Sequence, residues 1–183
     1  ALKYINMSLD YNAENYFAPY VKASILFAKD GNVERTRNLM IKEWNKDTTR
    51  LDILQDIGKF YYIEENYDGA YFYFKKFVEA REANGLDINR QENVKIAQVY
   101  KKMDLDTKAE KLFNDFSAYC EEDTSSYKSV NLVWKYAYEG KINEAIEQLR
   151  IFSEAENYMY WFLLIEDEPL IKPLKVHPDF DAI

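Results

Sequence analysis

Apolar residues recur along this chain at helical spacing, in segments that are themselves repeated. The clearest segment is 51–80, which contains two apolar stripes, one of Leu54, Ile57, Gly58 and Tyr61 and one of Ala70, Phe74 and Phe77. A spacing of three and four residues places each stripe on one face of an α-helix. A polar turn at 65–68 separates the two stripes. The pattern therefore predicts a helical hairpin in which the two apolar faces meet.

A small residue stands at the same point of four such segments, just after a polar turn. These residues are Thr36, Ala70, Ala109 and Ala145, with gaps of 34, 39 and 36 residues. The positions expected to face them on the first helices are Ser24, Gly58, Ala97 and Val133. Small side chains let two helix backbones approach to about 8 Å. The sequence predicts four hairpins that cross at these points, over 16–46, 51–83, 90–120 and 126–154.

A period of this length is typical of a solenoid built from helix pairs. Gly and Pro are scarce, at 5 and 4 in 183 residues, as long helices require. We therefore expect an all-α fold of about four helix pairs in a single domain, 1–183. Residues 1–12 read as the second helix of an incomplete repeat, which predicts that the chain is a fragment of a longer protein.

The repeated positions carry a family resemblance. The second segment supplies Leu54, Ile57, Gly58, Tyr61, Ala70, Phe74 and Phe77, and the third supplies Ile96, Ala97, Tyr100, Ala109, Phe113 and Phe116. The fourth supplies Leu132, Val133, Tyr136, Ala145, Leu149 and Phe152, and the first has Tyr20, Ala23, Ser24, Phe27, Thr36 and Met40. In this pattern the chain resembles the tetratricopeptide repeat (TPR) family. The resemblance implies a right-handed superhelix that binds proteins on its concave face.

The chain departs from the TPR pattern at two places. The middle segments lack the proline that usually closes a repeat, and residues 82–89 lengthen the second junction. Gly85 is expected to end a long helix in that stretch.

At the C-terminal end, we expect a helix from Ala155 to Ile165 and then a tail in which Pro169 and Pro173 break helicity.

The tail retains apolar residues that need burial, namely Leu170, Leu174, Phe180 and Ile183. Residues 155–183 are therefore predicted to cap the last helix pair, because the end of an array must cover its apolar face. The tail also resembles the ending that follows repeats in bacterial signalling proteins with cyclase, kinase or DNA-binding domains. Asp179 departs from that ending, where Arg is usual.

Charge and composition narrow the choice of partners and compartment. The net charge is −8 and the pI is about 4.9, so phosphate backbones and anionic lipids repel the chain. The longest apolar run, 158–165, is shorter than a membrane span. We expect neither nucleic-acid binding nor membrane insertion. The single cysteine excludes an internal disulfide, which fits the cytoplasm, with the periplasm as the alternative.

The sequence offers little for catalysis. His177 is the only histidine and lies in the tail, while Cys120 ends an apolar stretch and is expected in the core. Carboxylates cluster at 121–123 and 166–168, but adjacent helical residues diverge by about 100° and do not converge on an ion. We therefore expect no enzyme activity, no cofactor and no metal.

The remaining candidate site is the concave groove that the TPR resemblance implies. Side chains off the packing stripes of the first helices are expected to line it: Lys59, Tyr62, Gln91, Lys95, Gln98, Lys101, Trp134 and Tyr138. Aromatic side chains are typical of protein contacts. Alternatively, the lysines form a solvated face. A Lys and Asn clamp for a carboxylate terminus is not expected, because Ile25, Lys59, Gln98 and Trp134 stand where the Asn would be.

A second candidate surface is the aromatic helix at 71–77, where Tyr71 and Tyr73 lie outside the repeat core. They either pack on a neighbouring repeat or form a dimer or partner interface.

The sequence leaves three candidate functions. The first is a protein-interaction scaffold, the regulatory segment of a larger bacterial signalling protein. The second is a self-association module that positions attached domains. The third, a small-ligand binder or enzyme, has the least support.

Overall fold

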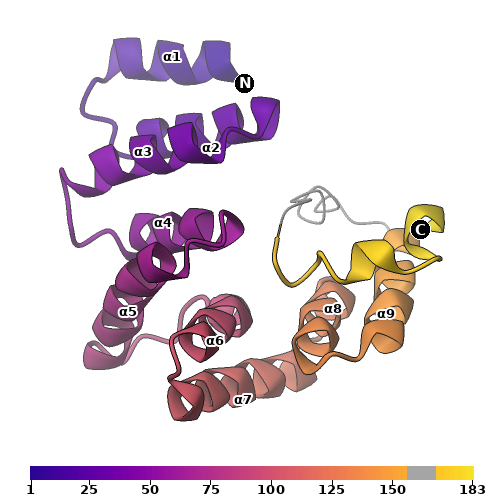
Figure 1. Cartoon of the computed structure of the whole chain (residues 1–183). Coiled ribbons are helices and arrows are strands. Elements are labelled where there is room, and N and C mark those ends of the chain that lie inside the picture. The colour runs from indigo at the N-terminus through magenta and orange to yellow at the C-terminus, as the bar shows by residue number, and fades with distance from the viewer. Residues whose placement is uncertain (156–167) are drawn as a thin grey trace. The chain divides into compact units, whose positions relative to one another are not determined.

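The computed structural model describes residues 1–155 and 168–183, and their regular structure is entirely helical (Figure 1). The expected all-α fold is confirmed. The chain divides into two compact units, unit 1 (Ala1–Leu86) and unit 2 (Asp87–Ile183). The division falls within the junction 82–89, which the sequence marks as longer than the others. The predicted helix at 155–165 lies almost wholly outside the described residues.

Unit 1 consists of five helices that each pack on their neighbours in the sequence. They are α1 (Leu2–Tyr11), α2 (Ala18–Asp30), α3 (Val33–Trp44), α4 (Leu51–Ile63) and α5 (Tyr67–Ala83). Helices α2 and α3 form one pair and α4 and α5 form the next, as the segments 16–46 and 51–83 predict (Figure 1). Helix α1 packs on α2.

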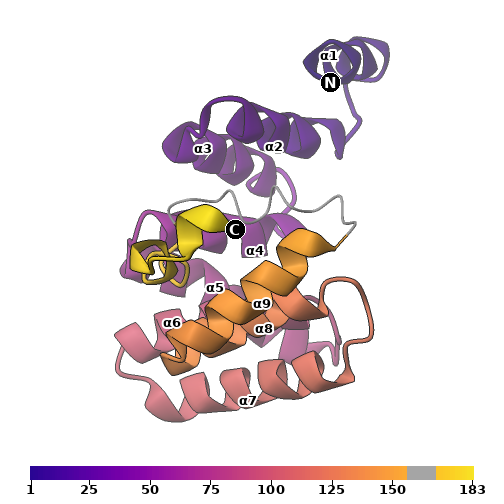
Figure 2. The same cartoon turned by 90° about the vertical axis from the view of Figure 1, so that its right-hand side faces the viewer.

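The described part of unit 2, 87–155 and 168–183, contains two further pairs and the C-terminal turns. Its elements are η1 (Arg90–Glu92), α6 (Asn93–Lys102), α7 (Asp106–Glu122), α8 (Lys128–Glu139), α9 (Ile142–Glu154), η3 (Leu174–Val176) and η4 (Phe180–Ala182). Helix α6 pairs with α7 and α8 with α9, and α6 also contacts α8. Figure 2 shows α9 alongside α8, with α7 below them in that view.

A turn that contains one left-handed residue joins the two helices of every pair. A residue with a left-handed backbone ends each first helix: Gly31, Glu65, Asp104 and Gly140, with φ of 64°, 55°, 58° and 75°. Each stands five residues before the small residue of its segment. In three pairs the next amide donates to the carbonyl of Tyr61, Tyr100 or Tyr136, at 2.8–3.0 Å. These are Schellman caps, which reverse the chain at a fixed point. The repeat is therefore a repeat of turn geometry as well as of apolar stripes.

The small residues predicted at the crossings of the paired helices are buried. Thr36, Ala70, Ala109 and Ala145 are at most 2% exposed. At the α4–α5 crossing, a Cβ atom on Gly58 would lie 2.5 Å from Cδ1 of Phe74, closer than non-bonded carbons approach. Glycine is required there because the ring of Phe74 fills the space of a side chain.

The second junction begins with a capped helix end. Helix α5 stops at Ala83, and Gly85 has a φ of 60°. The Gly85 amide donates to the Glu82 carbonyl at 3.2 Å, and the Leu86 amide donates to the Arg81 carbonyl at 3.0 Å. This pair of hydrogen bonds is again a Schellman cap. Gly85 thus ends the helix as predicted.

The core of unit 2 includes part of the tail. Phe116, Val133, Leu149 and Phe152 form an apolar cluster with neighbouring side chains of α6 to α9. Leu170, Ile171 and Leu174 are buried in the same cluster, and Phe180 and Ile183 pack against it. The apolar anchors that the sequence singles out in the tail therefore lie on the last two helix pairs.

Candidate functional site

The eight residues predicted for the groove fall in both units. Lys59 and Tyr62 lie on α4 of unit 1, where Lys59 is partly buried and Tyr62 is fully buried. The other six lie in unit 2, on η1, α6 and α8. We call these six residues the α6–α8 face: Gln91, Lys95, Gln98, Lys101, Trp134 and Tyr138.

Two cation–π contacts join α6 to α8 on this face. The Lys95 Nζ lies 4.3 Å from the centroid of the Trp134 ring, and the Lys101 Nζ lies 5.8 Å from that of Tyr138. The lysines are six residues apart on α6, which separates them by about 9 Å along the helix. The face therefore has an inner end at Lys95 and Trp134 and an outer end at Lys101 and Tyr138.

Lys95 lies inside unit 2 and not on an open groove. Its side chain is 2% exposed. The Nζ lies 3.0 Å from Oε2 of Glu92 and 3.7 Å from Oε1 of Glu168, which is also 2% exposed. A buried ammonium group needs such carboxylate partners to replace its hydration. The sequence predicted Lys95 as a groove residue and did not indicate these two carboxylate partners. The partners explain how a lysine can be buried here.

Trp134 closes the inner end of the face. The residue is 8% exposed and belongs to the apolar cluster of unit 2. Its Nε1 is buried and has no hydrogen-bond acceptor among the described residues. Buried indole N–H groups usually find such a partner. The inner end thus combines a paired lysine with an unused donor.

The outer end of the face is more accessible. Lys101 is exposed, and Gln91, Gln98 and Tyr138 are partly buried. The Tyr138 ring stacks on Phe113, with centroids 4.3 Å apart and planes at 20°. Burial and the nearby charge of Asp106 raise the pKa of the Tyr138 hydroxyl. The phenol is therefore neutral at physiological pH and can donate or accept a hydrogen bond.

The second predicted surface, at Tyr71 and Tyr73, lies on α5 in unit 1. Tyr73 stacks on Tyr61 with centroids 5.6 Å apart, and its ring meets that of Trp44 edge-on at 5.9 Å. Burial raises the pKa of the Tyr73 hydroxyl, with a smaller contribution from Tyr61. Tyr71 and Tyr73 are both partly buried. Of the two alternatives predicted for this surface, internal packing or an interface, Tyr73 therefore shows internal packing.

Two residues of the inner end were not among the predicted site residues, Glu92 and Glu168. Glu92 stands three residues before Lys95, a spacing that brings side chains together on one helix face, so this pair was detectable. Glu168 belongs to the acidic run 166–168, which was considered from the sequence only as a metal site and was set aside. Its contact with Lys95 spans more than seventy residues, and no local pattern predicts such a contact.

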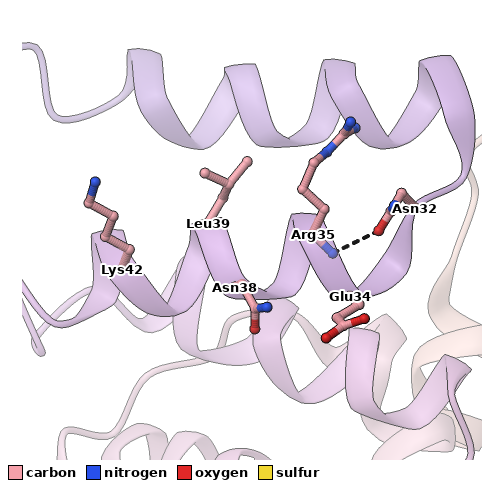
Figure 3. Close-up of a pocket in the computed structure, with 6 residues that line it drawn as sticks. All are labelled: Asn32, Glu34, Arg35, Asn38, Leu39 and Lys42. Atoms are coloured by element: carbon pink, nitrogen blue, oxygen red, sulfur yellow. Dashed lines mark hydrogen bonds between the residues drawn. The ribbon is translucent and has the colours of Figure 1, made fainter.

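An open hollow lies on α3 in unit 1, lined by Asn32, Glu34, Arg35, Asn38, Leu39 and Lys42 (Figure 3). The Asn32 side chain accepts a hydrogen bond from the Arg35 amide at 2.8 Å and so caps the helix. In Figure 3, Arg35 and Leu39 point to one side of α3, while Glu34 and Asn38 point to the other. The side chains do not converge on a point where a ligand would sit.

Cys120 and His177, the two residues considered for catalysis, make contacts typical of structural residues. Cys120 is buried in the core of unit 2, and burial raises the pKa of its thiol to about 12. The His177 Nε2 lies 3.2 Å from Oδ1 of Asn143, and its Nδ1 accepts a hydrogen bond from the Asp179 amide. Across 1–155 and 168–183, no group of three His, Cys, Asp or Glu residues is placed to hold a metal. In the same ranges no helix has the length and apolar character to cross a bilayer.

Comparison with known proteins gives no further guide to this site. No protein-family model, curated protein or solved structure matches the chain.

Proposed function

We propose that the chain is a protein-interaction scaffold with a TPR-like superhelix, and that the α6–α8 face of unit 2 binds a protein or peptide. In this proposal the chain is a non-catalytic, regulatory segment of a larger bacterial signalling protein in the cytoplasm. The observation that carries the proposal is the outer end of the face. There an exposed cation, a partly exposed amide and a phenol stand together on two packed helices.

This combination of side chains suits peptide contact. Tyr138 is held by the Phe113 ring and offers a rigid aromatic surface that loses little entropy on binding. Lys101 lies over the Tyr138 ring, which orients its charge before a ligand arrives. A Gln side chain such as Gln98 can both donate to and accept from a peptide backbone. The face is therefore suited to a partner that carries negative charge.

A capture experiment with matched variants tests this function. The tagged chain is compared with a face variant, Gln98→Ala with Lys101→Glu and Tyr138→Ala, and with a control, Lys108→Glu on the exposed part of α7. Partners are cross-linked in cells and identified by mass spectrometry. We expect one set of proteins to be captured by the wild type and the control and lost from the face variant. Equal capture by all three chains would contradict the proposal.

A second candidate function is self-association, which α1 favours. Tyr4, Met7 and Tyr11 are 72%, 54% and 95% exposed and form a stripe at helical spacing on one side of α1. Such a stripe is normally covered in an assembled protein. Light scattering over a range of concentrations tests this function. We expect Tyr4→Ser with Tyr11→Ser to abolish any dimer, and a wild-type chain that stays monomeric at high concentration would exclude self-association.

A further inference from the structure

We infer that the C-terminal segment Glu168–Lys175 occupies the inner end of the α6–α8 face in place of a partner peptide. The partner would carry a carboxylate followed at two, three and six residues by aliphatic side chains, and it would compete with this segment. The inference rests on the proposed function and gives it a ligand chemistry. The contacts of the segment itself define that chemistry.

The carboxylate is the first element of this recognition. Glu168 meets Lys95, whose Nζ is already held by Glu92 and by the face of the Trp134 ring. Lys95 is therefore oriented before Glu168 arrives, and one of its sides receives the incoming acid. The separation of 3.7 Å to Glu168 is longer than the 3.0 Å to Glu92. Of the two contacts that Lys95 makes with carboxylates, the one with Glu168 is therefore the longer.

The aliphatic side chains are the second element. Leu170, Ile171 and Leu174 are at most 3% exposed and are buried in the cluster that contains Trp134. The segment also folds on itself, because the amides of Ile171 and Lys172 donate to the Glu168 carbonyl at 2.9 and 3.1 Å. The segment is thus a compact turn that presents one acid and three aliphatic groups to α6, α8 and α9.

The unused donor of Trp134 makes an exchange of peptides energetically feasible. A buried N–H without an acceptor has lost its hydrogen bond to water without a replacement, which is unfavourable. A partner that places a carboxylate or carbonyl oxygen against Nε1 of Trp134 would gain a hydrogen bond that the described tail residues do not make. In addition, a buried ion pair often contributes no more to stability than apolar side chains of similar volume, because both charges lose their hydration.

Tethering sets the size of the effect to be measured. A segment of the same chain competes at an effective concentration of about millimolar, so a free peptide at micromolar concentration is largely excluded. The apparent affinity for the free peptide is the intrinsic affinity multiplied by the fraction of chains in which the face is open. Weakening the contact between Lys95 and Glu168 should therefore increase the affinity for a free peptide, by about tenfold or more.

The experiment uses the full chain and a fluorescein-labelled peptide with the sequence of 168–175, EPLIKPLK, measured by anisotropy. The chains are the wild type, Glu168→Gln, and Glu168→Gln combined with Lys95→Met. We expect Glu168→Gln to bind the peptide at least about tenfold more tightly than the wild type does. A control peptide with Gln in place of its Glu should bind Glu168→Gln about tenfold more weakly, and the double variant should bind neither.

Other outcomes overturn the inference. Equal affinities of the wild type and Glu168→Gln, or of the two peptides, would mean that the segment is a structural cap only. Circular dichroism checks the fold of each variant, and the milder Leu174→Val, which loosens an aliphatic contact, provides a second variant that should also increase peptide affinity. The capture experiment is independent, because its variants alter the outer end of the face. A further outcome is that the wild type captures partners that the face variant loses, while wild type and Glu168→Gln bind the labelled peptide equally. That result would reject this inference and leave the proposed function standing.

Discussion

The two units share one hairpin design but differ in what they bury. In unit 1 the α4–α5 crossing is closed by the contact of Gly58 with the Phe74 ring. Unit 2 also buries an ionic cluster, in which Lys95 contacts Glu92 and Glu168. The overall charge differs as well. Unit 1 has 12 basic and 13 acidic side chains, a net charge of −1, and unit 2 has 12 and 19, a net charge of −7.

The use of cations shows what this difference means. In unit 1, Arg37 lies 4.5 Å from the Tyr61 centroid and forms an ion pair with Glu64, while the exposed Lys76 lies 4.2 Å from the Phe72 centroid. In unit 2, Lys95 is buried with carboxylates and binds the separate tail segment. Burying a charge costs stability unless its partners replace the lost hydration, so the two carboxylates around Lys95 are needed for the fold of unit 2. The comparison indicates that the repeated residues determine the helix pairs, and that charged residues within the apolar interior identify the candidate site on the α6–α8 face.

The largest expected effect tests whether the two units unfold separately. Phe77→Ala in unit 1 and Phe116→Ala in unit 2 each remove a fully buried ring, with an expected loss of about 3–5 kcal/mol. Urea unfolding is followed through Trp44 or Trp134, each in a chain where the other tryptophans, Trp161 included, are replaced by Phe. Each variant should lower only the transition of its own unit. A single shared transition that both variants lower equally would break the comparison.

The next effect tests the ionic interior of unit 2. Lys95→Met leaves two buried carboxylates without their cation and should destabilise unit 2 by about 3 kcal/mol. The control is Lys108→Met, at an exposed position near the start of α7, which should change stability by less than about 0.5 kcal/mol. Urea unfolding monitored by circular dichroism measures both. Similar small losses for the two variants would show that Lys95 does not hold the interior together.

A smaller effect concerns the turns that the two units share. Gly140→Ala places a Cβ at a φ of 75° and should cost about 1–2 kcal/mol. The equivalent residue Asp104 already has a left-handed backbone, with a φ of 58°, so Asp104→Gly should gain a few tenths of a kcal/mol. Thermal unfolding shows the sign of each change. A loss of stability in Asp104→Gly would mean that the aspartate side chain stabilises this turn.

The smallest effect is the pH dependence of unit 1. Hydrogen bonds from Arg50, at 2.9 and 2.6 Å, lower the pKa of Asp52 below its ordinary value of 3.8. A lowered folded-state pKa stabilises the fold above pH 4, and the contribution is lost as the pH falls through the folded value. The carboxylate is 44% exposed, so a few tenths of a kcal/mol are expected. Asp52→Asn should flatten the dependence of unit 1 stability on pH below 4, and an unchanged curve would argue against this ion pair.

The sequence predicts much of the fold, because its signals are local. Apolar spacing located the four helix pairs, and Gly85 marked the end of α5. The turns were harder to foresee at Glu65 and Asp104, because neither residue favours a left-handed backbone as strongly as glycine does. The interior of unit 2 could not be foreseen. Lys95 resembles any off-stripe lysine until Glu168 is brought to it by the fold.

The central claim is that the segment Glu168–Lys175 is held on the α6–α8 face as a separable ligand. Backbone hydrogen exchange in Glu168→Gln tests it most directly. The amides of Ile171, Leu174 and His177 donate to carbonyls within the tail, and the amide of Ala145 at the start of α9 donates to Lys141. We predict that the three tail amides exchange at least about tenfold faster in Glu168→Gln while Ala145 keeps its wild-type rate. Unchanged exchange in the tail, or equal acceleration of the tail and α9, would contradict the claim.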